Sequence, residues 1–487
     1  MPLNETVILS KNPYYEKMKE EWEFFELSYN GGRPYILDNC TLIQYTRESK
    51  ADYDKRRQRA WFKNCCESVV NIWASYIFRE KTIRNYGGIE AFHADADENI
   101  DLSGTDVFKF WANAARMAAT FGHAFILVDM PIKDESIITR ADEIALGIRP
   151  YLRLISPLNV PDWEVDTNGD LTYIRIEYDY TEPRDWNKPR VYGKPKRRSL
   201  IYTREEWFVV NEQNRVVFEG AHGLGIVPVS ILYFDKLAPL VSKGMLNTIA
   251  YINNSLYNKD SQLDQILCDI TFPMMTIQAD EGELKDLNVG ATTVLRYPRE
   301  ASAPGFISPS DSPARLLMEN HQALVNEIYQ TAMLTNRSAD MSAVTQSGTS
   351  KAWDFNDTNS GLAAYADNIQ NAEINANKII AKWLGTEFDG SIIYPDTFDI
   401  QGLSDMIAQA LDLTSMSISP TFDIETKKRI ASKSLVGIEP EIMDKIINEI
   451  ETQASTPLIA DMPEQMPDMN NVDEEAEGLN DRNQEKD

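Results

Sequence analysis

Apolar residues recur at helical spacing over two long stretches in the second half of the chain, which predicts helices over residues 313–334 and 351–384. The first stretch has a proline where a helix commonly begins. The inward positions of the first helix are Leu317, His321, Leu324, Ile328 and Ala332. Those of the second are Leu362, Tyr365, Ile369, Ala372, Ala376, Ile379 and Trp383.

Residues 335–350, between these helices, show no apolar period and are rich in small polar side chains. Two stiff helices around a soft polar loop make a poor catalytic pocket and suit a mechanical part. An ordinary helical hairpin in a large α-rich domain is the alternative interpretation.

The first half of the chain mixes the helical period with the period of two that is typical of strands. Helices are predicted at 14–29, 50–77 and 105–121, and a buried strand at 124–130. Alternation over 150–235, with a turn signal at Asn168-Gly169, predicts one antiparallel sheet of about six or seven strands. The fold class is therefore predicted to be α+β.

The remaining segments complete the predicted order of elements. A helix is expected at 242–268, then a small β module with strands at 274–278 and 291–297. A strand at 391–394 follows the second long helix, and short helices are expected at 400–411, 423–434 and 440–454. From residue 455 the chain is acidic and poor in aliphatic residues, which predicts disorder.

Composition excludes several classes of function. The 487-residue chain has a net charge of −27, which opposes generic nucleic-acid binding, although an acidic wall can let a duplex pass without sticking. No run approaches the roughly 18 apolar residues of a membrane helix, so no membrane association is expected. The four cysteines lack CxxC spacing, which favours a reduced, intracellular compartment.

No catalytic, nucleotide-binding or metal-binding motif is present in the sequence. We therefore expect no catalytic residues, no cofactor and no metal site. The four histidines are isolated, and His123, beside the strand at 124–130, is predicted to lie at the edge of the core rather than to act as a base.

A basic cluster interrupts the predicted sheet. Its seven cations, offset by Asp185 alone, are Arg184, Lys188, Arg190, Lys194, Lys196, Arg197 and Arg198. A solvated hairpin loop is one interpretation. The other is an electrostatic patch for an acidic protein partner, or for DNA near its path, with Trp186 and Tyr192 interleaved.

The order of these parts resembles the portal (head-to-tail connector) proteins of tailed double-stranded DNA bacteriophages. The stretches that carry the resemblance are TFGHAFILVDMP (120–131), VPVSILYFD (227–235) and the loop 336–353 with SGTSKAW. The resemblance implies a wing (1–241 and 351–399), stem helices (242–269 and 313–334), a clip (270–312), a tunnel loop (335–350), a crown (400–454) and a disordered acidic tail (455–487).

The resemblance also implies a function. Portals are homo-oligomeric rings of about twelve subunits at one capsid vertex of the virion, assembled in the host cytoplasm. They form the channel for DNA packaging and ejection, and bind the terminase large subunit, neck or tail adaptors, and major capsid and scaffolding proteins. The implied tunnel-loop residues facing double-stranded DNA are Asn336, Arg337, Ser338, Ser347, Gly348 and Ser350. The basic cluster would lie on the wing and face capsid or scaffold.

Three alternatives stay open on the sequence. The chain could be another structural protein of a phage particle, such as an adaptor or minor head protein, although adaptors are much shorter. It could be an intracellular enzyme with a dispersed active site, or a scaffold that binds partners through its acidic tail.

Overall fold

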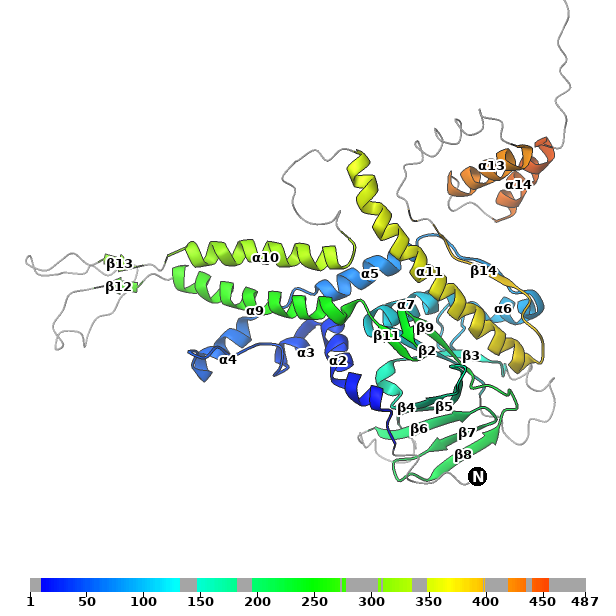
Figure 1. Ribbon diagram of the computed structural model, residues 1–487, viewed down its shortest axis with the longest axis horizontal. Helices are drawn as coiled ribbons and strands as arrows, with labels where there is room; N and C mark the ends of the chain where they lie inside the picture. Colours follow the sequence, from blue (N-terminus) through cyan, green and yellow to red (C-terminus); the bar gives the residue numbers. More distant parts are fainter. Residues whose placement is uncertain are drawn as a thin grey trace, which may run out of the picture. The chain divides into compact units, whose positions relative to one another are not determined.

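The computed structural model describes residues 10–131, 147–181, 195–271, 274–276, 305–307, 310–334, 348–396, 398, 419–434 and 440–454. These belong to two compact units, Met1–Asp399 and Ile400–Asp487. The first unit combines helices with antiparallel sheets, so the predicted α+β class is confirmed (Figure 1).

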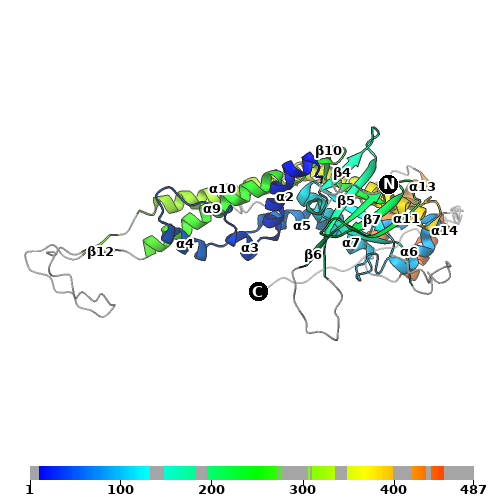
Figure 2. The ribbon, with the colours of Figure 1, turned by 90° about the horizontal axis from the view of Figure 1, so that it is seen from below.

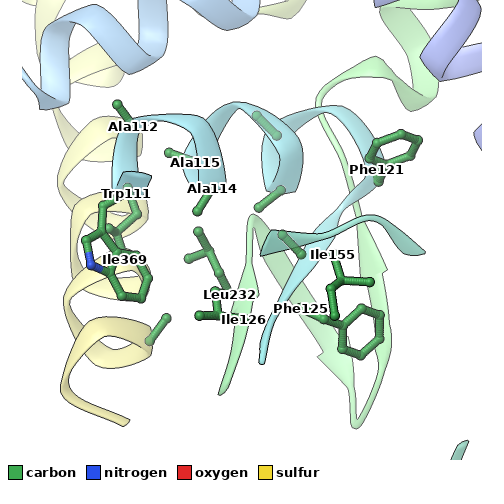
Figure 3. Close-up of a cluster of buried hydrophobic side chains, with 14 of the residues drawn as sticks. Trp111, Ala112, Ala114, Ala115, Phe121, Phe125, Ile126, Ile155, Leu232 and Ile369 are labelled. Carbon is green, nitrogen blue, oxygen red and sulfur yellow. The ribbon is translucent and has the colours of Figure 1, made fainter. Parts of the chain in front are cut away.

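The core of the first unit is a layer of helices on a three-stranded sheet. Strand β2 (His123–Asp129) lies in the middle, paired antiparallel with β3 (Tyr151–Ile155) and β9 (Val229–Tyr233). Helices α7 (Val107–Phe121) and α11 (Gly348–Leu384) pack on it. Figure 3 shows side chains from α7, β2, β3, β9 and α11 meeting in one apolar cluster.

The turn from α7 into β2 depends on Gly122. Its φ of 97° is in the left-handed region that favours glycine. A Cβ there would lie 2.6 Å from the Ser242 Oγ and 3.0 Å from the Gly244 nitrogen. The close approach of these segments therefore excludes a side chain at this position.

A second sheet has the order β4-β5-β6-β7-β8, with every pair antiparallel. Its strands are β4 (Asp162–Val165), β5 (Leu171–Tyr180), β6 (Lys196–Thr203), β7 (Glu206–Val210) and β8 (Val216–Ala221). The prediction of one sheet over 150–235 is wrong, because β3 and β9 pair with β2 instead. The β2 residues from Ala124 to Val128 are fully buried, and a strand buried on both faces is stabilised by partners along both edges.

The N-terminal helices are α2 (Pro13–Asn30), α3 (Gly32–Leu37), α4 (Lys50–Arg59) and α5 (Cys65–Ile77). The prediction of one helix over 50–77 is wrong, since the helix is interrupted between α4 and α5. The Asn64 side chain accepts a hydrogen bond from the Glu67 nitrogen at 2.9 Å and so caps a new helix. Trp61 lies in the break and is 53% exposed.

Several short elements complete the first unit: β1 (Ile83–Asn85), a 3₁₀ turn (Gly87–Ile89), α6 (Glu90–Ala96), a 3₁₀ turn (Pro157–Asn159), β10 (Asp235–Ala238) and β11 (Val241–Lys243). The predicted strand near 391–394 is β14 (Ser391–Ile393), which pairs antiparallel with β1. Arg84 on β1 forms an ion pair with the buried Glu373 of α11 at 2.7 Å, which fixes this ribbon to the core.

Two long helices extend from the core as a hairpin. Helix α9 (Leu246–Thr271) leads to β12 (Met274–Thr276), which pairs antiparallel with β13 (Gly305–Ile307), and α10 (Ser312–Thr331) returns alongside α9 (Figures 1 and 2). The predicted helices and the strand at 274–278 are confirmed within a few residues. The predicted strand at 291–297 lies outside the described residues.

The second unit contains α13 (Pro420–Ser434) and α14 (Pro440–Ala454), which confirm the helices predicted at 423–434 and 440–454. The two helices pack against each other. Lys428 joins them through an ion pair with Glu451 at 2.8 Å. The predicted helix at 400–411 and the acidic tail lie outside the described residues.

Candidate functional site: the α9–α10 hairpin

Helix α9 buries one face against α10. Its apolar contribution includes Ile249 and Leu256, both fully buried, and α10 contributes Val325 and Ile328. Apolar packing of this kind provides the non-directional part of the contact.

Two polar contacts fix the register between the hairpin helices. Lys259 donates to the Asn320 Oδ1 at 2.7 Å, and the His321 Nδ1 lies 2.6 Å from the Asp260 Oδ1. Asp260 is 5% exposed, so its carboxylate depends on His321 for a partner across the hairpin. His321 lies on the face that the helical period predicted to be inward.

The opposite face of α9 combines Tyr257, which packs against Tyr35 and Phe62, with buried polar side chains. Asn254 donates to the Tyr35 hydroxyl at 2.8 Å and to the Thr41 carbonyl at 2.9 Å. One turn later, Asn258 donates to the same carbonyl at 2.9 Å and accepts from the Ile43 nitrogen at 2.8 Å. Amides on successive turns of α9 therefore satisfy the backbone of an irregular segment that has no ladder of its own.

Arg56 of α4 completes this polar contact. It is 2% exposed and donates to both oxygens of Glu48 at 2.7 Å, to the Ser261 Oγ of α9 at 2.7 Å, and to the Ile43 carbonyl at 2.7 Å. The hydrogen bonds from Arg56 hold the pKa of Glu48 below its usual range. A buried guanidinium with this many acceptors fixes α4 and the preceding loop on α9.

Sequence reasoning missed Arg56, Asn254 and Asn258. Asparagine is a weak helix former, so several asparagines inside one predicted helix could have indicated buried hydrogen bonding. Their partners lie about 200 residues away in the chain. Local spacing does not reveal contacts of that range.

Two neighbouring helices hold the C-terminal end of α10. The Trp73 indole donates to the Ala332 carbonyl at 2.9 Å, and Thr358 of α11 donates to the Met333 carbonyl. Of the predicted tunnel-loop residues, Asn336, Arg337, Ser338 and Ser347 lie outside the described residues. The expectation that Gly348 and Ser350 lie in the loop is wrong, because α11 already begins at Gly348.

The basic cluster is described only at its end. Lys196, Arg197 and Arg198 form the start of β6 rather than a loop. Arg197 pairs with Glu177 at 3.3 Å, and Arg198 stacks over the Tyr180 ring, 3.4 Å from its centroid. The other residues of the cluster lie outside the described residues: Arg184, Lys188, Arg190 and Lys194.

A cavity of about 770 Å³ lies between the two sheets and the end of α11. Asp129, at its wall, accepts hydrogen bonds from the Tyr202 hydroxyl at 2.5 Å and the Tyr151 hydroxyl at 3.1 Å. Burial raises the pKa of Asp129. The His222 Nε2 lies 3.1 Å from the Thr203 carbonyl, so these polar groups already have structural partners.

His123 is buried in the core, with its Nδ1 2.8 Å from the Ser242 Oγ. Burial lowers its pKa to about 3, so it is neutral near pH 7. It lies deeper than the core edge at which it was expected. Across the described ranges, no group of three or more His, Cys, Asp or Glu side chains could hold a metal ion. No helix in those ranges is long and apolar enough to cross a membrane.

Comparison with known proteins gives no family model and no curated protein that matches this chain. Among solved structures, this chain is similar to a chain from the neck of a native gene transfer agent (GTA) particle computed with C12 symmetry. The TM-score is 0.42 and the identity 11%, and the match covers 77% of this chain and 90% of that chain. A chain from the neck of an empty GTA particle, computed with C6 symmetry, gives a TM-score of 0.41, 11% identity, and coverage of 79% and 89%.

A chain from the virion of a native gene transfer agent particle gives a TM-score of 0.40 and 10% identity, covering 79% of this chain and 89% of that chain. Scores of this size at this identity establish neither a shared fold nor a shared function.

Proposed function

We propose that this chain is a portal protein, forming a ring at one capsid vertex through which double-stranded DNA is packaged and ejected. The observation that supports this most is the path of the chain through the α9–α10 hairpin. The chain leaves the core around β2 along α9, forms the β12–β13 pair, returns along α10 and packs again on the core through α11. That is the wing, stem, clip, stem and wing order of the portal family.

In this proposal the parts of the chain have distinct mechanical roles. Residues 1–241 and 351–399 are the wing, 242–269 and 313–334 the stem, and 270–312 the clip that binds terminase and later the neck or tail adaptors. Residues 400–454 are the crown. The basic cluster on β6 and the preceding residues faces capsid or scaffolding protein.

The channel is a passive conduit, and the chemistry of ATP belongs to the terminase. Each subunit has a net charge of −27, so a ring of about twelve subunits would repel a duplex and let it slide. Residues 335–347 project toward the DNA in this proposal. Arg337 is the cation of that segment and would lie near the phosphates.

The loop assignment is tested by replacing residues 335–347 with a shorter Gly/Ser linker. We expect rings to form as before, because Trp73 holds the end of α10 and Thr358 joins it directly to α11, independently of the replaced residues. DNA packaging or retention by particles carrying this variant should fall. The matched control is a Gly/Ser replacement in the β7–β8 turn, residues 211–214, which should leave packaging unchanged. Normal packaging by the loop variant would contradict this role.

A further inference from the structure

The surface of residues 31–64, here called the α3–α4 face, is basic in an acidic chain. The segment has eight Lys or Arg and four Asp or Glu, whereas the whole chain carries −27. Its exposed cations are Arg33, Arg47, Lys50, Lys55, Arg59 and Lys63. Three of them form ion pairs: Lys50 with Asp54 at 3.2 Å, Lys55 with Asp52 at 3.5 Å and Arg59 with Asp264 at 3.7 Å. The segment still carries more cations than anions. Three exposed apolar side chains lie among them: Leu37 (51%), Ile43 (58%) and Trp61 (53%).

The outward side of α10, here called the α10 face, is acidic and exposes an apolar side chain. Leu316 is 67% exposed. Glu319 and, about three turns beyond Leu316, Glu327 are exposed on the same side of the helix, while Arg315 is engaged with Asp311 of the same helix at 2.8 Å. Exposed apolar residues within a charged rim are typical of protein–protein contact sites.

These two faces lie on opposite sides of α9. Helix α9 binds the α3–α4 segment through Asn258 and Ser261, and it contacts α10 through Leu256 and Lys259. Residues two positions apart on a helix point about 200° apart. Figure 1 accordingly shows α4 and α10 on opposite sides of α9.

We infer that the α3–α4 face of one copy docks on the α10 face of a second copy of this chain. The opposite charges and the exposed apolar side chains on both faces match each other, whereas two identical faces would set like charges together. Because the contacting faces differ and lie on opposite sides of one layer, the contact repeats head to tail and can close into a ring. This docking rests on the proposed function, which requires a ring, and identifies the faces that build it.

The test uses charge reversal on the full-length protein, read by mass photometry. Lys50→Glu, Lys55→Glu and Lys63→Glu together reverse the charge of the α3–α4 face, and Glu319→Lys with Glu327→Lys reverses the α10 face. Each multiple variant alone should assemble with an apparent dissociation constant raised about 10-fold or more. Mixing the two in equal amounts should restore rings, since alternating copies then present opposite charges at every contact.

A matched control is Lys19→Glu on α2, whose side chain is 44% exposed and which belongs to neither face. It should assemble like the wild type. Rings that survive both reversals, or reversed variants that fail to assemble when mixed, overturn this docking and leave the proposed function standing. A wild-type chain that stays monomeric at every concentration overturns both.

Discussion

The core around β2 and the α9–α10 hairpin differ in what fixes their packing. In the core, Trp111, Phe125, Ile126 and Ile369 are buried among other apolar side chains (Figure 3). In the hairpin, α9 meets its outer segment through an aromatic cluster around Tyr257, and also through buried amides, hydroxyls and an ion pair. Both regions therefore remove apolar area from water, and in the hairpin directional bonds also fix the geometry.

The difference matters for a part that must hold a defined angle. Apolar contacts tolerate sliding, because one methyl group replaces another at little cost. Asn258, in contrast, has acceptor and donor matched to Ile43 and Thr41, and a shift of one residue would leave both unpaired. A polar contact of this kind suits a stem whose position relative to neighbouring copies must be reproducible.

The largest expected effect is in the core. Trp111→Ala removes a 1% exposed side chain between α7 and α11 and should lower the free energy of unfolding by about 4 kcal/mol. Denaturant unfolding followed by circular dichroism measures this change. A loss below about 1 kcal/mol would show that the site collapses around the cavity, contrary to a tightly packed core.

The next effect is in the hairpin. Arg56→Ala leaves Glu48 and Ser261 without their partner and should cost about 3 kcal/mol. The loss should be local, so hydrogen exchange should accelerate over residues 31–64 and stay slow over 123–129. Lys19→Ala on α2, 44% exposed and on neither docking face, is the control with little change. Uniformly faster exchange would show that the two regions unfold together.

Lowering the pH should destabilise residues 31–64 through the ion pair of Arg56 with Glu48. The pKa of Glu48 is lowered in the folded state by its hydrogen bonds from Arg56, so the unfolded chain binds more protons. The stabilisation is present near neutral pH and is lost as pH falls through the acidic range. Exchange over residues 31–64 should accelerate on acidification in the wild type. This added pH dependence should be absent from Arg56→Ala, and its persistence there would assign it to other carboxylates.

The sequence predicted best what is encoded locally. The periods of α7, α10 and α11 come from side chains within each helix, and these helices lie where they were expected. The division of the strands into two sheets, the β1–β14 pair and the break before Asn64 depend on partners distant in the chain. In the candidate site, the hairpin helices were predictable from the sequence. The polar contacts that attach α9 to residues 31–64 were not, because the amides along α9 do not by themselves identify their partners.

A smaller effect is expected at a single amide. Asn258→Ala removes the bonds to Ile43 and Thr41 and should cost about 2 kcal/mol, since buried backbone groups lose their partners. Asn254→Ala provides a comparison one turn away, where two donated bonds and one bond accepted from Asn258 are lost while the Ile43 nitrogen keeps its partner. Thermal unfolding of both variants ranks their losses of stability. An Asn258→Ala variant as stable as the wild type would show that water replaces the hydrogen bonds of the amide.

The smallest effect is expected at the exposed ion pair of α2. Lys19→Ala breaks the contact with Glu23 at 3.5 Å and should change the free energy of unfolding by less than about 0.5 kcal/mol. A larger change, measured in the same denaturant series, would mean that surface charge contributes to stability as the buried pair does.

The central claim is tested most directly by the mass and shape of the purified full-length protein, from mass photometry combined with electron microscopy. The account predicts closed rings of about twelve copies with a central channel, in which the α3–α4 face of each copy meets the α10 face of the next. A compact monomer or dimer at every protein concentration would contradict it.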